Sequence, residues 1–316
     1  MSMNPEFNLN EEIMDEWKVT AEQKRIWQVE LKLTEELYRV CKKHGIRPVA
    51  GFGTQLGAVR HGGFIPWDND MDFIMSRGDY NRLSKLAGEF KAPYFLQTVE
   101  TEQGKWFRGW IRLVDCNTTC LTPKDLTNPD CHSGIYIDIF PMDRNPDPAK
   151  KGKCKRFAFQ VQLLRYLCLL KVYGKQEIKG GFPKRMMGKT LLKLMKPVDV
   201  FKLCHRFDLV CRKYNKTDFD GFSAIAFGYG KNTRYQYMHT KDQLRPLMTQ
   251  KFENTEVEIP VNYDQYLRSI YGDTYMEFPS MKDREFHYQN IMDPDIPYKE
   301  YMEQQIGTEH GLETME

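Results

Sequence analysis

Three aspartates, Asp68, Asp70 and Asp72, occupy alternate positions in a segment with mainly apolar neighbours. If this segment is a β-strand, their side chains project from one face, and Met71 and Phe73 project from the other face into a core. Like charges about 7 Å apart along a strand repel one another unless a cation lies between them. Because these ligands are all oxygens, the pattern predicts a site for magnesium or, alternatively, manganese.

A calcium-binding loop and a solvated acidic turn are the alternatives to a magnesium site at these aspartates. A calcium-binding loop needs glycine at its sixth position and glutamate at its twelfth, but these positions hold Phe73 and Asp79. A solvated acidic turn should have polar neighbours, whereas apolar residues flank these aspartates. Magnesium usually takes one or two carboxylates and completes its shell with phosphate oxygens and water, which is compatible with a phosphate-bearing substrate.

A glycine-containing turn before the aspartates is a candidate phosphate site. Gly53 and Thr54 follow a predicted strand and begin a predicted helix, so backbone N–H groups and a hydroxyl would face an anion. Arg60 and His61 follow one or two turns later and could reach the same phosphates. The segment is not a dinucleotide-binding fingerprint, because Leu56 stands where glycine is required, and the chain contains no P-loop motif. A plain turn at Gly53 is the alternative.

A further aspartate, Asp138, stands inside the alternating apolar segment 135–140. A carboxylate on a buried face is costly unless it has a partner, and a shared metal would supply one. Asp138 could then be the third carboxylate of a two-metal site, or it could accept the proton of an attacking hydroxyl. A structural aspartate that caps a loop is the alternative.

The order of predicted elements indicates an α+β fold. Thr20 and Gln23 have the spacing of a capping box at the start of a helix that ends near Gly45. Strands are predicted at 48–52, 70–75, 94–99, 107–114, 135–140 and 256–259, and further helices at 53–60, 79–90, 149–172, 188–214 and 263–271. We therefore predict a catalytic core with an N-terminal helix at 1–148, followed by a mostly helical, substrate-binding portion at 149–316.

Charge is unevenly distributed along the chain. The net charge is +3, but residues 150–216 contain 19 Lys or Arg and 3 Asp or Glu, while the remainder contains 27 basic and 40 acidic residues. Such a basic block needs an anionic neighbour or a solvated face. A helical apolar stripe within it makes an anionic membrane surface one candidate partner, and the acceptor substrate and the acidic remainder are the others. This stripe consists of Phe157, Val161, Leu164, Cys168 and Val172.

The chain begins with a polar, acidic segment, and no apolar run approaches the roughly 18 residues of a membrane span. We therefore expect a cytoplasmic protein, either free or held peripherally at the inner membrane face. Its eight cysteines are expected to be reduced thiols. Cys116, Cys120, Cys131 and His132 could be imagined as a zinc set, but their spacing matches no finger or ribbon pattern.

Taken together, these segments resemble the LicD family. Its members share a glycine-threonine turn that leads to an arginine, a Gly-x-Ile-Pro-Trp-Asp-x-Asp-x-Asp motif and a later Ile-Asp-Ile-Phe-Pro motif. The matching segments here are 53–60, 63–72 and 137–141. Near the C-terminus, Tyr-Gly-Asp at 271–273, Pro279, Arg284 and His287 resemble the family's ending, so the resemblance extends over most of the chain.

The resemblance implies a nucleotidyltransferase-like fold, similar to that of DNA polymerase beta, with a mixed sheet and flanking helices. It implies that Gly53 and Thr54 bind donor phosphates and that Asp70, Asp72 and Asp138 hold magnesium. The other expected donor contacts are Arg60, Trp67, Asp68, Arg284 and His287. Members of the family transfer phosphocholine from CDP-choline to cell-surface glycans such as lipopolysaccharide or teichoic acid. Relatives similar to fukutin-related protein transfer ribitol phosphate from CDP-ribitol.

The expected activity is therefore transfer of phosphocholine, or of another phosphorylated head group, from a CDP-linked donor to a glycan hydroxyl, with release of CMP. A metal-dependent glycosyltransferase that uses a nucleotide sugar is the alternative, and a binding module without turnover is a third hypothesis that the intact aspartates disfavour. Trp106, Trp110 and Tyr136 are candidates for an aromatic cage around choline, although such rings more often belong to a core. No nucleic-acid partner is expected.

Overall fold

The computed structural model describes residues 7–122, 125, 128–178, 180–229, 238–284 and 291–306, and it confirms the predicted α+β class. A mixed sheet at its centre has the strand order β3-β4-β8-β6-β5, with β9 paired to the end of β8. Within this sheet β4 and β8 run parallel, and the other described pairs are antiparallel. The strands are β3 (Val49–Ala50), β4 (Asp72–Ser76), β5 (Tyr94–Gln97), β6 (Ile111–Asp115), β8 (Tyr136–Arg144) and β9 (Phe222–Ser223).

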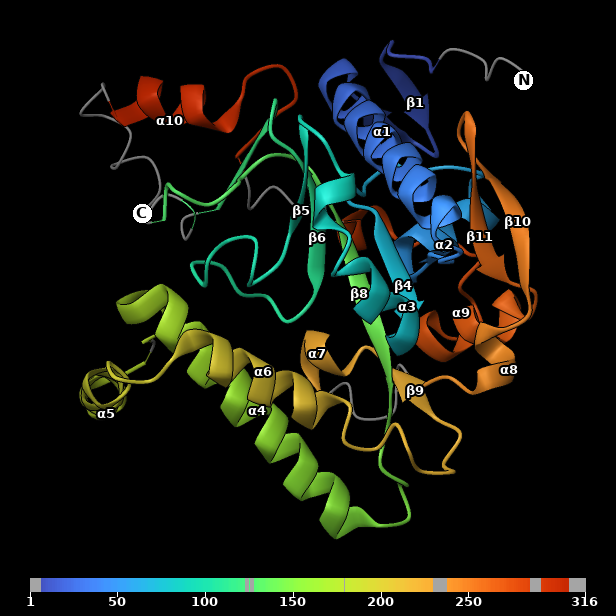
Figure 1. Ribbon diagram of the computed structural model, residues 1–316. Helices are drawn as coiled ribbons and strands as arrows, with labels where there is room; N and C mark the ends of the chain where they lie inside the picture. The colour runs from blue at the N-terminus through green and yellow to red at the C-terminus, as the bar shows by residue number, and fades with distance from the viewer. Residues whose placement is uncertain are drawn as a thin grey trace.

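The long helix α1 (Ala21–Lys43) covers one face of this sheet (Figure 1). Its N-terminus is capped by Thr20, whose side chain accepts the N–H of Gln23, as predicted. The reciprocal half of the predicted capping box is replaced by a longer-range contact, because the Gln23 side chain donates to the carbonyl oxygen of Pro66 at 2.8 Å. Leu33 and Leu37 of α1 pack in the main core together with odd-numbered residues of β4, β6 and β8.

The other face of the sheet is covered by α2 (Phe52–Arg60) and α9 (Tyr263–Tyr271), whose bounds agree with the predicted helices. Ile74 and Phe140 of the sheet pack there against Leu56 of α2 and Tyr266 of α9. A hairpin of β10 (Leu247–Phe252) and β11 (Thr255–Pro260) contributes Phe252, Val257 and Ile259 to the main core. The chain beyond residue 240 thus returns to the first half, and the mostly helical character predicted for 149–316 is concentrated in 151–211.

The basic segment forms α4 (Lys151–Tyr173), α5 (Phe182–Leu194) and α6 (Val200–Cys211), which lie together away from α1 (Figure 1). A separate apolar cluster, which includes Phe157 and Phe207, joins α4 to α6 and to the short helix α7 (Ile225–Gly228). The single helix predicted at 188–214 is wrong. Pro197 cannot donate a helical N–H, and Asp199 starts a new helix by accepting the N–H of Lys202 at 2.8 Å.

The remaining elements are short. They are β1 (Glu12–Met14), β2 (Trp17–Val19), α3 (Arg77–Leu83), β7 (Thr119–Leu121), α8 (Lys241–Leu244), β12 (Ile291–Asp293) and α10 (Tyr298–Ile306). The helix predicted at 79–90 ends at Leu83, before the weak helix formers Ser84 and Gly88. The strand predicted at 107–114 begins only at Ile111, because Gly109 has a φ of +97° that extended backbone does not adopt. No helix in the described part of the chain is both long and apolar enough to cross a membrane.

Candidate active site

Three adjacent strands place Asp72, Asp138 and Arg112 in one row across the centre of the sheet. Asp72 on β4 is the parallel partner of Asp138 on β8, and Asp138 is the antiparallel partner of Arg112 on β6. Direct partners on neighbouring strands share a face, so the three side chains lie next to one another. Arg112 Nε donates to Asp138 Oδ1 at 2.8 Å, and both side chains are buried. Asp138 therefore has an ion-pair partner in the ligand-free chain.

Arg112 was not among the residues predicted from the sequence. Its guanidinium lies 3.4 Å from the centre of the Tyr136 ring, so that ring is covered by a cation from the chain itself. The available signal was a single cation inside the otherwise apolar segment 111–114, which matches the pattern that identified Asp138. Trp110, another predicted cage residue, packs against Phe140 at a ring distance of 5.1 Å.

Asp68 and Asp70 lie in the loop before β4, because the strand begins at Asp72. The prediction that all three aspartates project from one face of a strand is therefore wrong. Side chains of α1 bind the carbonyl groups of this loop: Gln23 donates to Pro66, and Trp27 Nε1 donates to the carbonyl oxygen of Asp68 at 3.0 Å. These carbonyl groups bind α1 side chains. In a strand they would instead accept hydrogen bonds from a neighbouring strand. The carboxyl groups of Asp68 and Asp70 nevertheless meet in a hydrogen bond.

Burial dominates the electrostatics of this aspartate cluster. It raises the pKa of Asp68 to about 6, against the effect of a hydrogen bond with Asp70. Burial, followed by repulsion from neighbouring carboxylates, raises the pKa values of Asp70 and Asp72 well above their ordinary range. The carboxylates of this cluster are therefore more stable when they are protonated or bound to a cation than when all of them are charged and unpaired.

A fifth carboxylate, that of Glu30 on α1, interacts electrostatically with these aspartates. The residue is 1% exposed, and its Oε2 atom has no hydrogen-bond partner within the described structure. Burial first, and then the charges of Asp70, Asp68 and Asp72, raise the pKa of Glu30 well above its ordinary value. Glu30 was not predicted from the sequence, although a glutamate three positions after Trp27 on the buried side of a helix was a usable signal.

The donor set suits a hard divalent cation. It consists of carboxylate oxygens, one of them buried without a donor, and magnesium prefers such ligands. Among the described residues, however, no three His, Cys, Asp or Glu side chains form a ready-made metal site. Binding would therefore require the carboxylates to rotate toward a common centre, and Asp138 would have to share its charge between the metal and Arg112.

The predicted phosphate turn lies directly beside the aspartates. A Cβ atom at Gly53 would lie 2.8 Å from Asp68 Oδ2, so glycine allows this close approach between the first turn of α2 and the loop. Thr54 is buried, and its hydroxyl oxygen accepts the N–H of Asp72 at 2.7 Å. Gly53 and Thr54 thus connect the start of α2 to the start of β4, which brings the predicted phosphate site to the aspartates.

A cavity of about 520 Å³ opens next to this turn. It joins residues of the glycine and aspartate segments to the distant segment 271–283, which carries the C-terminal pattern singled out in the sequence. The lining residues are Gly53, Leu56, Arg60, Ile65, Trp67, Asp68, Tyr271, Thr274, Tyr275, Glu277, Phe278, Pro279 and Asp283. Aromatic rings and carboxylates therefore predominate on a wall that begins at the phosphate turn.

Arg60 and Arg284 bind the chain itself in this wall. Arg60 Nη1 donates to the carbonyl oxygens of Tyr275 at 2.9 Å and of Glu277 at 3.2 Å. The Arg284 guanidinium lies 4.4 Å from the centre of the Trp67 ring and donates to backbone carbonyl groups, among them that of Asp15. Both arginines thus join distant segments around the cavity, and their contacts to donor phosphate stay predictions.

Of the two candidate histidines, the structure describes His61 but not His287. His61 Nε2 lies 3.2 Å from the Asp15 carboxylate, but burial, followed by the charge of Arg60, lowers the pKa of His61 to about 4. A neutral imidazole adds no positive charge for a phosphate. His287 lies outside the described residues, so its predicted donor contact stays a prediction.

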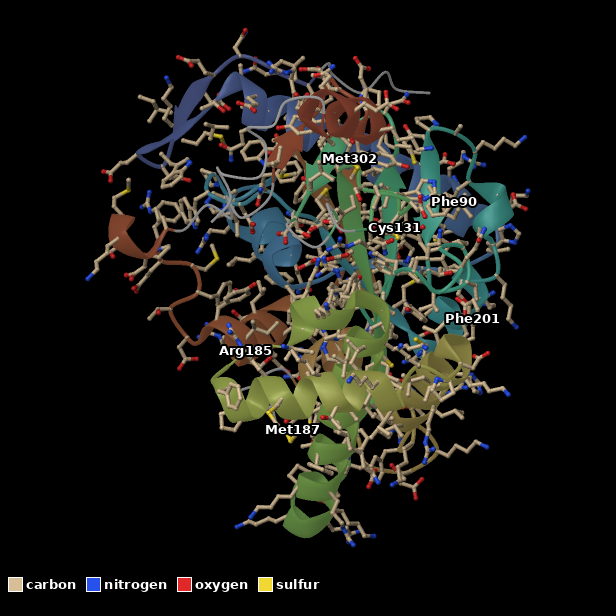
Figure 2. The ribbon with its side chains drawn as sticks, turned by 90° about the vertical axis from the view of Figure 1, so that its left-hand side faces the viewer. Phe90, Cys131, Arg185, Met187, Phe201 and Met302 are labelled. Carbon is tan, nitrogen blue, oxygen red and sulfur yellow. The ribbon has the colours of Figure 1, made fainter. Side chains whose placement is uncertain are left out.

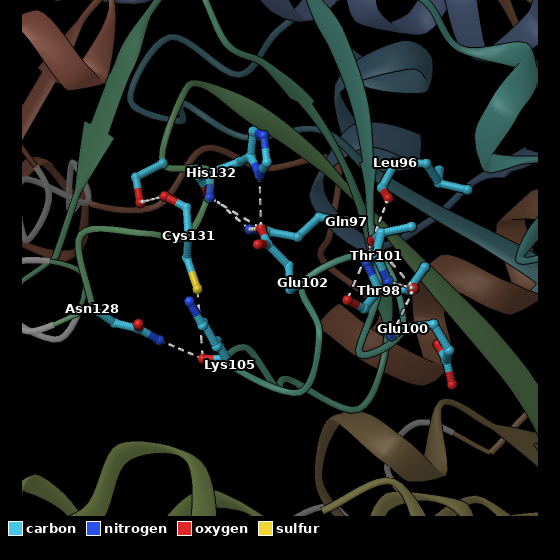
Figure 3. Close-up of polar contacts among 11 residues, drawn as sticks. Leu96, Gln97, Thr98, Glu100, Thr101, Glu102, Lys105, Asn128, Cys131 and His132 are labelled. Atoms are coloured by element: carbon cyan, nitrogen blue, oxygen red, sulfur yellow. Dashed lines mark hydrogen bonds and ion pairs between the residues drawn. The ribbon is translucent and has the colours of Figure 1, made fainter.

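Cys131 and His132, two of the four residues considered as zinc ligands, make polar contacts within the chain (Figure 3). Gln97, which is paired with Arg112 across β5 and β6, donates to Glu102 Oε1 and to the carbonyl oxygen of His132, each at 2.7 Å. Glu102 also lies 3.2 Å from His132 Nδ1, and Cys131 Sγ contacts the carbonyl oxygen of Lys105 at 3.5 Å. All eight cysteines are free, and this network extends the central row toward the edge of the sheet.

Comparison with known proteins identifies related sequences. Residues 45–162 match the family of LicD/FKTN/FKRP nucleotidyltransferase domains, a span that includes the glycine turn, the aspartate cluster and Asp138. The chain is 24% identical over 266 residues to the lipopolysaccharide cholinephosphotransferase LicD of Haemophilus influenzae, which covers 82% of this chain and 92% of that protein. It is also 27% identical over 145 residues to an uncharacterised protein of Rickettsia prowazekii, a match that covers 43% of this chain and 50% of that protein.

Proposed function

We propose that this chain, whose residues 45–162 match the family of LicD/FKTN/FKRP nucleotidyltransferase domains, transfers phosphocholine from CDP-choline to a hydroxyl of a cell-surface glycan and releases CMP. The acceptor would be a glycan or a lipid-linked glycan. The observation that carries the proposal is the row of Asp72, Asp138 and Arg112 beside the half-buried Asp68 and Asp70. The similarity to a cholinephosphotransferase supports the choice of head group.

Magnesium, or manganese, fits the oxygen ligands of this row. Asp70, Asp72 and Asp138 would hold it, with Asp68 and Glu30 as neighbouring carboxylates. When bound, the metal would neutralise the charge that builds up on the donor diphosphate during transfer. The repulsion among the buried carboxylates would then become favourable attraction to the cation, which is the physical reason to keep so many acids together.

The cavity beside the glycine turn is the proposed donor site. Backbone N–H groups at the start of α2, next to Gly53, would bind the diphosphate. Aromatic rings such as Trp67 and Phe278, together with the carboxylates of Glu277 and Asp283, line the same cavity. The rings of Trp67 and Phe278 are already approached by the guanidinium groups of Arg60 and Arg284, so the attraction for a further cation rests on the carboxylates. These carboxylates support a cationic head group such as choline over a neutral polyol.

In the proposed reaction, the acceptor oxygen forms a bond to the phosphorus that bears choline. The bond from that phosphorus to the bridging oxygen of the diphosphate breaks, and CMP leaves with the electron pair. The proton of the acceptor hydroxyl passes toward the Asp138 carboxylate, which Arg112 holds in position through their 2.8 Å contact. The protein contributes mainly position and electrostatics, as expected for phosphoryl transfer.

Mass spectrometry of the products tests the proposal. The purified chain would be incubated with a lipopolysaccharide-derived oligosaccharide and one of CDP-choline, CDP-ribitol or UDP-glucose, with magnesium or with EDTA. We expect a phosphocholine adduct and an equal amount of CMP from CDP-choline in magnesium, and neither in EDTA. A product that carries an added sugar without phosphate would instead identify a glycosyltransferase. Donor binding without any product would identify a binding module.

A further inference from the structure

The apolar stripe that the sequence offered for membrane contact is already packed inside the protein. Phe157, Val161 and Cys168 of α4 are buried in the cluster between α4 and α6. Leu164 and Val172 are partly buried against the same cluster. The stripe therefore explains how α4 attaches to its neighbours, and the large apolar side chains that α4 leaves exposed, Phe159 and Leu163, lie outside it.

Helix α5 has a second apolar face that is not packed in this way. Gly188 lies against Ile178, and Met195, just after the helix, is buried in the same cluster, so one side of α5 is attached to the molecule. On the outer side, large apolar side chains remain in solvent. They are Phe182, which is 77% exposed, Met186 at 58%, Met187 at 68% and Leu194 at 69%.

These four side chains form one surface, which we call the α5 outer face. At 100° per residue, positions 182, 186, 187 and 194 fall within about 140° of the helix circumference. Figure 2 shows α5 across the side of the molecule that is turned to the viewer, with Arg185 and Met187 on it. Exposed apolar side chains this close together indicate a binding surface, whereas single ones scattered over a protein are ordinary.

The charges around the α5 outer face have one sign. Residues 178–198 contain six Lys or Arg and no Asp or Glu. Arg185, Lys189 and Lys193 follow one another at four-residue intervals along the helix and are exposed. Within the described residues these three side chains form no ion pair, in contrast to Lys105, whose ammonium lies 2.6 Å from Asp130.

We propose that the α5 outer face docks on membranes that contain anionic lipids. The apolar side chains would enter the headgroup region, and the cationic row beside them would contact lipid phosphates. A second copy of this chain fits less well, because two such faces would bring their cationic rows together. Nucleic acid fits less well because it would leave four large apolar side chains uncovered. The proposal does not depend on the identity of the donor or the acceptor.

Vesicle co-sedimentation of the full chain tests this proposal. The vesicles would contain phosphatidylcholine alone or phosphatidylcholine with phosphatidylglycerol. We expect sedimentation with the anionic vesicles only, and release as salt rises, because screening weakens the cationic contribution. Sedimentation with neither type at low salt, or equally with both, would overturn the proposal.

Variants locate the contact. The double variant Met187→Ser/Leu194→Ser and the double variant Lys189→Glu/Lys193→Glu should each weaken binding to anionic vesicles at least about tenfold, the charge variant through loss of surface attraction. Ile13→Ser, at an apolar position on β1 that is 78% exposed, and Lys251→Glu on β10 are the matched controls and should bind as the unmodified chain does.

Two results with the variants would reject the α5 outer face. One is unchanged vesicle binding in both α5 variants, which would assign the contact to another part of the basic segment. The other is a change from dimer to monomer in size-exclusion chromatography together with unchanged vesicle binding, which would identify a second copy as the occupant. Because the substituted side chains are in solvent, equal thermal midpoints for all variants would establish that folding is intact.

Discussion

Around the first residues of β4 and β8, Asp138 and Glu30 are buried and Asp68, Asp70 and Asp72 are half-buried, whereas along α4, α5 and α6 most of the cations remain at the surface. A group of like charges that is largely removed from water is unfavourable by itself and requires a counter-ion. Exposed charges are solvated and require no partner. The acidic cluster therefore indicates a ligand from its electrostatics alone, while the basic segment indicates one only because apolar side chains are exposed beside its charges.

The strongest test of this contrast is neutralisation of one acid. Asp72→Asn or Asp70→Asn should reduce turnover by about 10³-fold or more, because a metal ligand is lost while side-chain volume is kept. Product formation from CDP-choline in magnesium measures the effect. Asp242→Asn, at an exposed aspartate on α8, is the control and should retain activity. Vesicle binding by the cluster variants should be unchanged, and near-full turnover in either would reject the metal assignment.

Asp138→Asn should affect turnover more than donor affinity. The amide can still lie beside Arg112, but it cannot accept a proton or neutralise a cation, so we expect a loss in kcat of about 10²-fold or more. Donor affinity should stay within roughly tenfold, because Asp70 and Asp72 would still hold the metal and the further role of Asp138 concerns the attacking hydroxyl. Calorimetric titration with CDP-choline and measurement of kcat separate the two. An unchanged kcat would make Asp138 a structural residue.

Glu30→Gln tests whether the orphaned carboxylate belongs to the ligand-binding cluster. We expect magnesium or manganese affinity to fall about tenfold to 100-fold, as it does when partners of metal ligands are changed. The metal-free variant should also be more stable than the unmodified chain at neutral pH, because glutamine is neutral when buried and does not have to take up a proton on folding.

The matched control for Glu30→Gln is Glu102→Gln. Glu102 is equally inaccessible, at 4% exposure, but its carboxylate already has Gln97 and His132 as partners. Its substitution should leave metal affinity unchanged. Calorimetric titration with manganese and thermal unfolding in EDTA provide the two readouts. A metal affinity that Glu30→Gln leaves intact would give Glu30 a purely structural role.

The smallest expected effect is a dependence of stability on pH. The raised pKa values of Asp70 and Asp72 mean that the metal-free folded chain keeps protons that the unfolded chain has already released. Its stability should therefore fall as pH rises above the ordinary aspartate pKa and through the raised pKa values, by up to about 1.4 kcal/mol per pH unit for each carboxyl that differs in protonation.

The buried histidines do not contribute to the dependence of stability on pH above about 6.5, their ordinary pKa. Burial lowers the pKa values of His61 and His239 to about 4, so they destabilise the fold only as pH falls from their ordinary value toward that one. Bound magnesium should remove the decline, because it replaces the retained protons. Thermal midpoints at pH 6.5 and 8, with EDTA and with magnesium, measure both effects. A midpoint in EDTA that rises with pH would contradict the cluster's predicted protonation.

The amino-acid sequence by itself determined the features that depend on neighbouring residues. The bounds of α9, the start of α1 at Thr20 and the extent of α2 follow from local periodicity and capping, and the structure has them where the sequence predicted. The candidate residues around Asp70 and Asp72 also came from a continuous motif. Such features can be read locally because backbone hydrogen bonds in helices join residues four positions apart.

Only the tertiary structure decided how these residues are used. Asp68 and Asp70 left the predicted strand because α1, some 40 positions earlier, binds the carbonyl groups of their loop. Arg112, on another strand, donates a hydrogen bond to Asp138, and Arg60 donates to carbonyl groups 215 and 217 positions away. The apolar stripe of α4 is likewise packed against α6, whereas the α5 outer face remains in solvent. In each case the group that binds the residue lies far from it along the chain. Local sequence patterns cannot predict such contacts, because only folding brings the two groups together.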